Sequence, residues 1–227
     1  MPPLQILFQD EFLVAIDKPA GMIVHPGRDK EDPKEIAILL LRDLLGRRVY
    51  PVHRLDRPTS GVQLFALDKQ TASLTQQAFA RREITKTYLA IVTGRTPPQW
   101  TCETPLKTNP EDDPLPAETS FERIAVTSPG NFANHSELVL SLLNASPHTG
   151  RFHQIRRHLL EAGFPIVGDF RYAGIEPSFE LGEILGTGTR MLLQSKTLEL
   201  MHPHTHEPLE IIAPADPDFE KCFPALN

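Results

Sequence analysis

Short apolar runs separated by turn residues recur along this chain, and they have the length and composition of β-strands. The runs Leu4 to Phe8 and Phe12 to Ile16 are separated only by Gln9-Asp10-Glu11, which predicts a hairpin at the N-terminus. Six further runs predict strands in the rest of the chain. They are Val62–Leu67, Thr87–Val92, Ala117–Val126, Glu137–Leu143, Met191–Leu200 and Leu209–Ile212.

Other segments carry apolar residues at helical spacing or show no period at all. Pro33 to Leu45 predicts an amphipathic helix that ends at Gly46. Asp68 is the expected cap of a second helix that runs to about Arg81. The segment Thr96 to Pro116 contains six prolines and little periodicity, so we interpret it as a long surface excursion that can close over a substrate.

A third helix is predicted over Gly150 to Ala162, with Thr149 as its N-cap and Gly163 as its stop. Its buried stripe is expected to consist of Phe152, Ile155, Leu159 and Ala162. Arg156 lies beside this stripe, so its side chain can point into a cleft while its neighbours pack. The alternative is a basic face that is simply solvated.

The composition limits the class of protein. The 227 residues are 40% hydrophobic and 23% charged, which is enough for one sizeable core, and we expect a single domain over residues 1–227. No apolar run approaches the length of about 20 residues that a membrane span needs, and no signal region opens the chain. We therefore expect a cytoplasmic protein. Cys102 and Cys222 lie far apart, so we expect neither a disulfide framework nor a cysteine-rich zinc site.

The net charge of −6 argues against a nucleic-acid partner, but its distribution argues for one. Between Arg42 and Arg95 there are ten basic residues against four acidic ones, a local excess that can meet phosphates. The acidic residues gather elsewhere, in stretches that we interpret as solvated loops facing away from a substrate. These stretches are Asp29–Asp32, Glu111–Asp113, Glu176–Glu183 and Glu207–Glu220.

The stretch from His53 to Gly61 places one carboxylate, Asp56, between the guanidinium groups of Arg54 and Arg57. Arginines stay charged at physiological pH, so we expect Asp56 to be held as the anion. Pro58 fixes φ and Gly61 permits φ above zero, which predicts a rigid loop leading into the next strand. A surface ion-pair cluster explains the same spacing. A fixed carboxylate beside phosphate-binding cations indicates chemistry on a nucleic acid.

The motif H-R-L-D followed by R-P-T-S-G resembles the signature of the RluA-type pseudouridine synthases, and is most similar to the tRNA pseudouridine synthase C branch. The run D-E-F-L-V-A-I-D-K-P-A-G resembles the opening of the same family, whose Lys-Pro-x-Gly loop lies near the active cleft. The resemblance implies an α+β domain on a largely antiparallel mixed sheet with flanking helices and a central active-site cleft. It also implies no S4-type RNA-binding extension. The implied activity is isomerisation of uridine to pseudouridine in RNA, with no cofactor and no metal.

The resemblance also implies roles for single residues. Asp56 corresponds to the catalytic aspartate, although its action as a nucleophile or as a base that leads to a glycal stays open. Arg54 is expected to fill the space of the extruded nucleotide or to contact phosphate. Tyr88, in the K-x-Y motif, is expected to stack on the flipped uracil, a contact worth about 1–3 kcal/mol per base. From the residues alone, a tyrosine in a strand most often belongs to the core.

Two further residues follow from other motifs. G-R-x-H-Q-I-R-R-H-L resembles the family's third motif, in which an arginine pairs with the catalytic aspartate, and Arg156 occupies that place. Leu193, in Met191-Leu192-Leu193-Gln194-Ser195, corresponds to an apolar wall of the uracil pocket. Here Gln194-Ser195 replaces the usual His-Ala, so the local polar contacts differ from the family pattern.

Within this resemblance, the implied target is uridine 65 in the acceptor–TΨC region of tRNA. A relative that modifies 23S rRNA is the nearest competitor, and a non-catalytic RNA-binding module is the alternative from another class. The run His202-Pro203-His204-Thr205-His206 offers alternate histidines for a metal-dependent hydrolase, but Pro203 and the lack of an acidic or cysteine ligand set argue against it. No obligate protein partner is implied.

Overall fold

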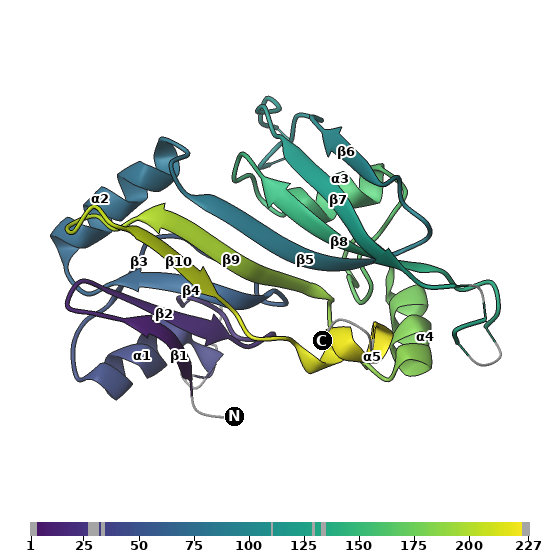
Figure 1. Cartoon of the computed structure of the whole chain (residues 1–227), viewed down its shortest axis with the longest axis horizontal. Helices are drawn as coiled ribbons and strands as arrows, with labels where there is room; N and C mark the ends of the chain where they lie inside the picture. The colour runs from purple at the N-terminus through teal and green to yellow at the C-terminus, as the bar shows by residue number, and fades with distance from the viewer. Residues whose placement is uncertain are drawn as a thin grey trace. The chain divides into compact units, whose positions relative to one another are not determined.

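The computed structural model describes residues 4–26, 32, 35–109, 111–128, 130–132 and 135–223. The chain divides into two compact units (Figure 1). The first unit consists of residues 1–86 and 194–214, and the second consists of residues 87–193 and 215–227.

A mixed sheet forms the centre of the first unit. Its strands are β1 (Gln5–Gln9), β2 (Leu13–Lys18), β3 (Tyr50–Pro51), β4 (Ser60–Ala66), β9 (Leu193–Met201) and β10 (Pro208–Ile212). The order is β1-β2-β4-β9, with β10 paired to β9 and β3 paired to β4. Only the pairing of β4 with β9 is parallel among these strands. β1 and β2 make the predicted N-terminal hairpin.

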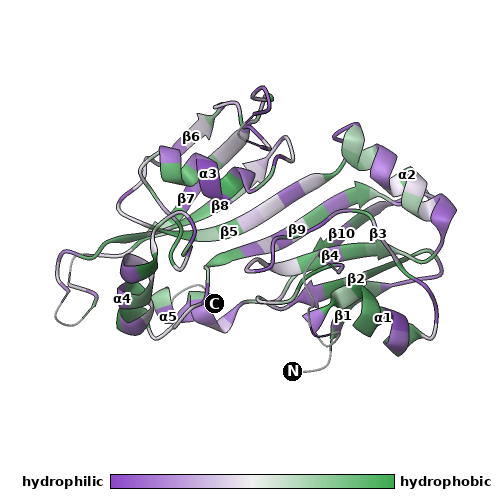
Figure 2. Cartoon of the chain, turned by 180° about the vertical axis from the view of Figure 1, so that it is seen from behind, coloured by the Kyte–Doolittle hydropathy of each residue, from purple (hydrophilic) through white to green (hydrophobic). Residues whose placement is uncertain are grey.

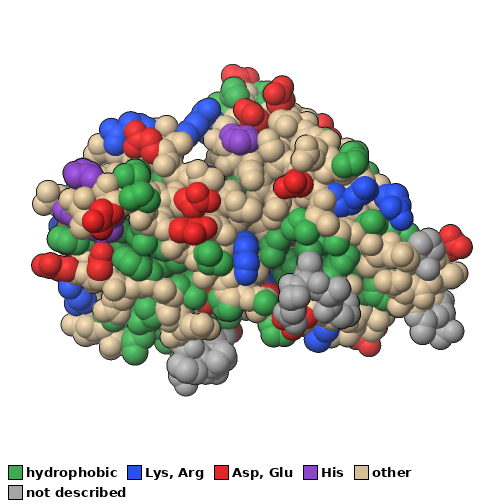
Figure 3. Space-filling view, viewed as in Figure 1, with side chains coloured by type: hydrophobic (Ala, Val, Ile, Leu, Met, Phe, Trp, Pro, Cys, Tyr) green, Lys and Arg blue, Asp and Glu red, His purple; other side chains and the backbone are tan. Residues whose placement is uncertain are grey.

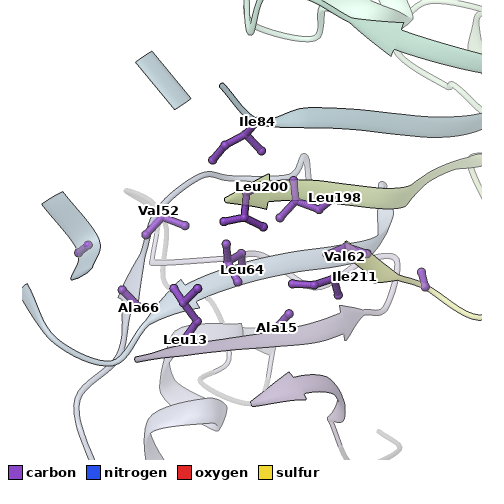
Figure 4. Packing of buried hydrophobic residues seen from close by; sticks show 12 residues of the cluster. Leu13, Ala15, Val52, Val62, Leu64, Ala66, Ile84, Leu198, Leu200 and Ile211 are labelled. Atoms are coloured by element: carbon purple, nitrogen blue, oxygen red, sulfur yellow. The ribbon is translucent and has the colours of Figure 1, made fainter. Parts of the chain in front are cut away.

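Both faces of this sheet are buried, so side chains on both sides of β2 and β4 lie in apolar surroundings. This explains why apolar residues occupy adjacent positions in these two strands instead of alternating with polar ones. One face carries Leu13, Leu64 and Leu198 and packs with Ala72 of α2 (Lys69–Ala80) (Figure 4). The other face packs against α1 (Ala37–Leu45), whose ribbon carries both hydrophobic and hydrophilic residues in Figure 2.

The ends of these two helices follow from the sequence. α1 ends at Gly46, which adopts the left-handed conformation with φ of 62°, as glycine does without a steric penalty. α2 begins after Asp68, whose carboxylate accepts a hydrogen bond from the backbone N–H of Thr71. Both predicted boundaries are confirmed. Such an aspartate cap typically contributes about 1 kcal/mol.

The second unit contains an antiparallel sheet in the order β5-β8-β7-β6. The strands are β5 (Thr85–Thr93), β6 (Gln99–Cys102), β7 (Thr119–Val126) and β8 (Leu140–Pro147), and the helices are α3 (Gln154–Glu161), α4 (Ile175–Leu185) and α5 (Pro217–Cys222). One sheet face packs on Ile155 and Leu159 of α3. The opposite face packs on Leu185 of α4 and on Phe219 of α5.

The predicted class, helices flanking a mixed and mostly antiparallel sheet, is confirmed. Some local predictions were wrong. The acidic stretch Glu176 to Glu183 lies in α4 and is not a loop, and the proline-rich excursion contains strand β6. The helix expected from Gly150 begins at Gln154, and Thr149 does not cap it, because its hydroxyl donates to the Gln154 side chain.

The chemistry of the surface is mixed. Lysine and arginine side chains are interspersed with aspartate and glutamate side chains on the face in Figure 3. Among the residues that the structure describes, no helix is long and apolar enough to cross a membrane.

Candidate active site

The loop that carries Asp56 is fastened to strand β4 through its backbone. Gln63, a fully buried amide in the middle of β4, accepts a hydrogen bond from the N–H of Leu55 (3.1 Å) and donates one to the carbonyl of His53 (2.8 Å). In return, the N–H of Leu64 donates to Nε2 of His53 at 2.9 Å. These bonds satisfy polar groups on both sides of Asp56, so the loop is held in one conformation.

The loop is fastened on its other side by the Lys-Pro-Ala-Gly turn. The N–H of Gly21 donates to the carbonyl of Arg57 at 2.8 Å, and Nε of Arg57 donates to the carbonyl of Gly21 at 2.9 Å. Lys18 is completely buried, and its ammonium donates to the carbonyls of Met22 (2.8 Å), Pro19 (3.0 Å) and Arg57 (3.3 Å). The structure thus joins this turn to the Asp56 loop.

Gly61 fixes the place where the loop becomes strand β4. Its φ of 100° lies in the region that favours glycine, and a Cβ at this position would collide with the backbone oxygen of Ser195 in β9. Close approach of the two strands therefore requires a glycine. This geometry gives a physical reason for the glycine at the end of the motif.

The side chains of the loop differ in exposure. Asp56 is half-buried and Arg54 is exposed. Arg57, which we expected to flank Asp56 as a second cation, forms an exposed ion pair with Glu35 at 2.8 Å. The loop therefore offers one half-buried carboxylate and an exposed guanidinium, while the other guanidinium is turned to Glu35.

His53 stays uncharged in this loop. Burial, together with the smaller effect of the positive charge of Lys86, lowers the pKa of its imidazole to about 3. The ring stacks on Phe79 at 5.0 Å between centroids. Burial likewise lowers the pKa of the Lys86 ammonium. A neutral His53 is required here, because its Nε2 accepts the hydrogen bond from Leu64.

In the second unit, Tyr88 and Leu193 come together. Leu193 is buried in the cluster that contains Ile155 of α3 and Ala145 of β8, and Tyr88 packs against the same cluster while staying half-buried. Tyr88 lies on β5 opposite Ala145. The two predicted uracil-contacting residues therefore belong to one cluster beside α3.

Arg156, next to Ile155 on α3, is held by a partner that the sequence analysis missed. Its Nε and Nη2 donate to the two carboxylate oxygens of Asp169, each at 2.7 Å. The two side chains are 5% and 1% exposed. The guanidinium also lies over the ring of Tyr172 at 5.0 Å. A bidentate pair fixes the plane of a guanidinium, so Asp169 positions Arg156.

The proline-rich excursion is attached to α3. The carbonyl of Thr104 is 3.0 Å from Nε2 of the buried His158, and the Thr104 hydroxyl donates to Glu161 at 2.9 Å. Arg157 donates to the carbonyl of Lys107 at 2.7 Å. In the part of the chain that the structure describes, this segment is packed on the helix.

The histidine run forms a turn, and its rings contact protein groups. Nδ1 of the buried His202 accepts from the N–H of Thr205 at 3.1 Å, and its Nε2 lies 2.9 Å from a carboxylate oxygen of Asp10. Nε2 of His204 lies 2.8 Å from the hydroxyl of Thr71. No group of three potential metal ligands occurs among the described residues.

Comparison with known proteins decides the family. Residues 12–161 match the family model described as RNA pseudouridylate synthase, and this segment contains the Asp56 loop, Tyr88 and Arg156. The chain belongs to the RNA pseudouridylate synthase family. It is therefore an isomerase that converts uridine to pseudouridine in RNA, and the predicted resemblance is confirmed.

Relatives of this synthase match nearly its whole length. It is 37% identical to "tRNA pseudouridine synthase C" of Haemophilus influenzae, over 97% of this chain and 96% of that protein. It is 38% identical to the protein of the same name from Pasteurella multocida, over 94% and 92% of the two chains. A solved structure titled "Human RNA Pseudouridylate Synthase Domain Containing 4" has a similar fold, with a TM-score of 0.74, 24% identity and coverage of 96% and 90%.

Three residues of the synthase that support the candidate site escaped the sequence analysis. Asp169 acts through a contact distant in sequence, which no local pattern reveals. Lys18 belongs to the Lys-Pro-x-Gly loop that the resemblance placed near the active cleft, but its bond to the Arg57 carbonyl was not foreseen. Gln63 was detectable, because it is an amide in the middle of the apolar run S-G-V-Q-L-F-A. A polar side chain inside a buried strand must have a hydrogen-bonding task.

Proposed function

We propose that this synthase isomerises a uridine of tRNA, at position 65 in the acceptor–TΨC region. The observation that carries the tRNA assignment is the nearly full-length similarity to two bacterial proteins named tRNA pseudouridine synthase C. The R-P-T-S-G sequence after Asp56 supports the same branch. We also propose that the reaction takes place in the cytoplasm, with RNA as the partner.

Asp56 is the proposed catalytic residue. The reaction breaks the C1′–N1 bond of the nucleotide, turns the uracil and joins C5 to C1′, and a proton leaves C5 while N1 gains one. The half-buried carboxylate can add to the nucleotide or remove the ribose 2′ proton, and both routes use the anion. The fastened backbone supports this role, because a reacting group must be held in place.

The proposed substrate-binding residues come from both units. Arg54, which is exposed beside Asp56, contacts phosphate or fills the space that the flipped nucleotide leaves. Tyr88 stacks on the uracil, and Leu193 supplies apolar surface in the same cluster. Arg156, oriented by Asp169, pairs with Asp56 in this proposal. In this proposal residues 1–227 act as a single catalytic domain.

The test is carbodiimide mapping of pseudouridine by primer extension on tRNA and 23S rRNA transcripts. Wild-type protein is compared with Asp56→Ala and with the control Asp43→Ala, which removes an exposed carboxylate of α1 that pairs with its neighbour Arg42. We expect a stop at tRNA position 65 with wild type and Asp43→Ala, and none with Asp56→Ala. Affinity for tRNA should stay within a few-fold in both variants, because no large contact is lost.

Other outcomes contradict specific parts of the proposal. A stop only in rRNA would transfer the synthase to the rRNA-modifying branch. Modification by Asp56→Ala at the wild-type rate would refute the catalytic assignment. Parallel loss of RNA binding in Asp56→Ala would mean that this residue contributes to affinity and not to the reaction alone.

A further inference from the structure

Phe152 is an exposed aromatic residue in the turn that leads into α3. It was expected to belong to the buried stripe of the helix, yet its side chain is 43% exposed. The helix begins two residues later, at Gln154, so Phe152 is not on its inner face. A single exposed apolar residue is common at a protein surface, so the meaning of this ring depends on the groups that surround it.

The backbone of His153, the residue after Phe152, adopts a conformation that is uncommon for residues other than glycine. His153 has φ of 54° and ψ of 31°, the left-handed region that residues other than glycine seldom occupy. This turn brings the rings of two consecutive residues face to face, with their centroids 3.7 Å apart and their planes at 22°. Backbone strain of this kind concentrates at functional sites.

The stacked pair is held in place by Tyr172, which follows the buried Asp169. Nδ1 of His153 lies 3.0 Å from the Tyr172 hydroxyl, and the two rings meet edge to face. Tyr172 in turn lies under the guanidinium of Arg156, which Asp169 fixes. The exposed ring of Phe152 is therefore presented by a rigid support that is connected to a proposed substrate-binding residue.

A cation completes this surface. The guanidinium of the exposed Arg171 lies 5.8 Å from the ring centroids of both Phe152 and Tyr172. Within the described ranges, Arg171 forms no ion pair with a carboxylate. We call Phe152, His153, Tyr172 and Arg171 the platform. A partly exposed aromatic ring close to an exposed arginine suits a ligand that carries both a flat ring and negative charge.

We propose that the platform binds one unpaired nucleotide of the RNA substrate, other than the target uridine. The base stacks on Phe152, and Arg171 contacts the adjoining phosphate. This inference rests on the proposed RNA function. An apolar protein partner would have no need of Arg171, and a purely electrostatic contact would have no need of the fixed ring.

Binding of a tRNA transcript to Phe152 variants tests the stacking. We expect Phe152→Ala to weaken affinity about tenfold, within the range that alanine substitution of a base-stacking residue gives. Phe152→Trp should retain affinity, and Phe152→Leu should behave like the alanine variant, because it keeps apolar area but has no π-face. Phe179→Ala is the matched control. That residue is a 50% exposed phenylalanine of α4 that contacts Phe170 and forms no part of the platform.

The salt dependence of RNA binding distinguishes the contribution of Arg171 from that of Phe152. Arg171→Gln should reduce the slope of log affinity against log salt by about 0.7–0.9, the value for one lost phosphate contact. Phe152→Ala should lower affinity at every salt concentration and leave the slope unchanged. Equal affinities of Phe152→Leu and wild type, or a slope change in Phe152→Ala, would overturn base stacking.

A scan with abasic tRNA transcripts identifies the nucleotide. One abasic position outside the target should weaken binding to wild type about tenfold and have no further effect on Phe152→Ala, since both changes remove the same contact. Additive losses at every unpaired position would refute the inference. If pseudouridine forms but Phe152→Ala binds like wild type, only this inference fails. Absence of pseudouridine on every RNA would instead reject the proposed function.

Discussion

In the first unit, the Asp56 loop is fastened mainly through backbone groups, whereas in the second unit Arg156 is fastened through its own guanidinium. Carbonyls and N–H groups of His53, Leu55 and Arg57 make most of the bonds that hold the loop, and Nε2 of His53 and Nε of Arg57 add two more. By contrast, Arg156 places two of its donors on the carboxylate of Asp169. The comparison teaches that substitution of Asp56 should leave its loop intact, while substitution of Asp169 should disturb the position of Arg156.

The largest effect on stability is expected for the buried pair of Arg156 and Asp169 in the second unit. Asp169→Ala should lower the free energy of unfolding by about 3–5 kcal/mol, because it leaves the Arg156 charge buried without that carboxylate. Urea denaturation measures the change. A loss of stability below about 1 kcal/mol would contradict the contrast between the two units, since Asp169 would then not be needed to position Arg156.

The first unit should be most sensitive at Lys18. Lys18→Met keeps the length of the buried side chain but removes the donors to three carbonyls, so we expect a loss of about 2–3 kcal/mol. The pseudouridine-forming rate should fall as well, because the Arg57 carbonyl is part of the Asp56 loop. Lys69→Met, on the exposed start of α2, is the control that should change neither quantity. An unaltered stability of Lys18→Met would show that the loop is held without the bonds of the Lys18 ammonium.

A smaller effect should appear as pH dependence of the first unit. The pKa of His53 is about 3 in the folded chain and about 6.5 when unfolded, so the unfolded chain binds more protons between these values. The contribution of neutral His53 to the free energy of unfolding is fully present above pH 6.5 and is lost as the pH falls toward 3. From pH 7 to pH 5 the loss is about 2 kcal/mol. Urea denaturation at pH 7 and pH 5 should show a smaller change in the free energy of unfolding for His53→Gln than for wild type. An equal change in the two proteins would contradict the assignment of this pH dependence to His53.

The smallest effect on stability is expected for the exposed ion pair of Arg57 and Glu35. Glu35→Gln removes the partner of Arg57 at the surface but leaves the Arg57 bond to Gly21 in place. Because solvent screens exposed ion pairs, the free energy of unfolding should change by less than about 1 kcal/mol. A change as large as that of Asp169→Ala would mean that exposure does not distinguish the two pairs.

The parts of the fold that depend on local chemistry were predictable from the sequence. The hairpin of β1 and β2, the Gly46 stop and the Asp68 cap each follow from neighbouring residues. Helix α4 was missed because its glutamates and Pro177 resemble a loop, and because Ser178 and Gly182, two of its three buried residues, are small. Leu185 is the one large apolar residue among the three, so the buried face gives a weak helical pattern.

The candidate site shows the same limit. Motif resemblance pointed to Asp56, Tyr88, Arg156 and Leu193, and their roles stay predictions. What supports them lies far away in the chain. Asp169 is 13 positions from Arg156, and Lys18 is 39 positions from the Arg57 carbonyl that it binds. Periodicity describes neighbours within a few turns, so it contains no information about these contacts.

The complete burial of Lys18 has a consequence for chemical labelling. An amine-reactive acylating reagent needs access to an unprotonated amine, and this amine is enclosed by carbonyls of the turn (Pro19 and Met22) and of the Asp56 loop (Arg57). Its labelling therefore requires the loop and the turn to separate, unlike labelling of the exposed Lys69. The ratio of the two acylation rates, followed by mass spectrometry, would measure how often the site opens, and bound RNA that covers the loop would slow only the first.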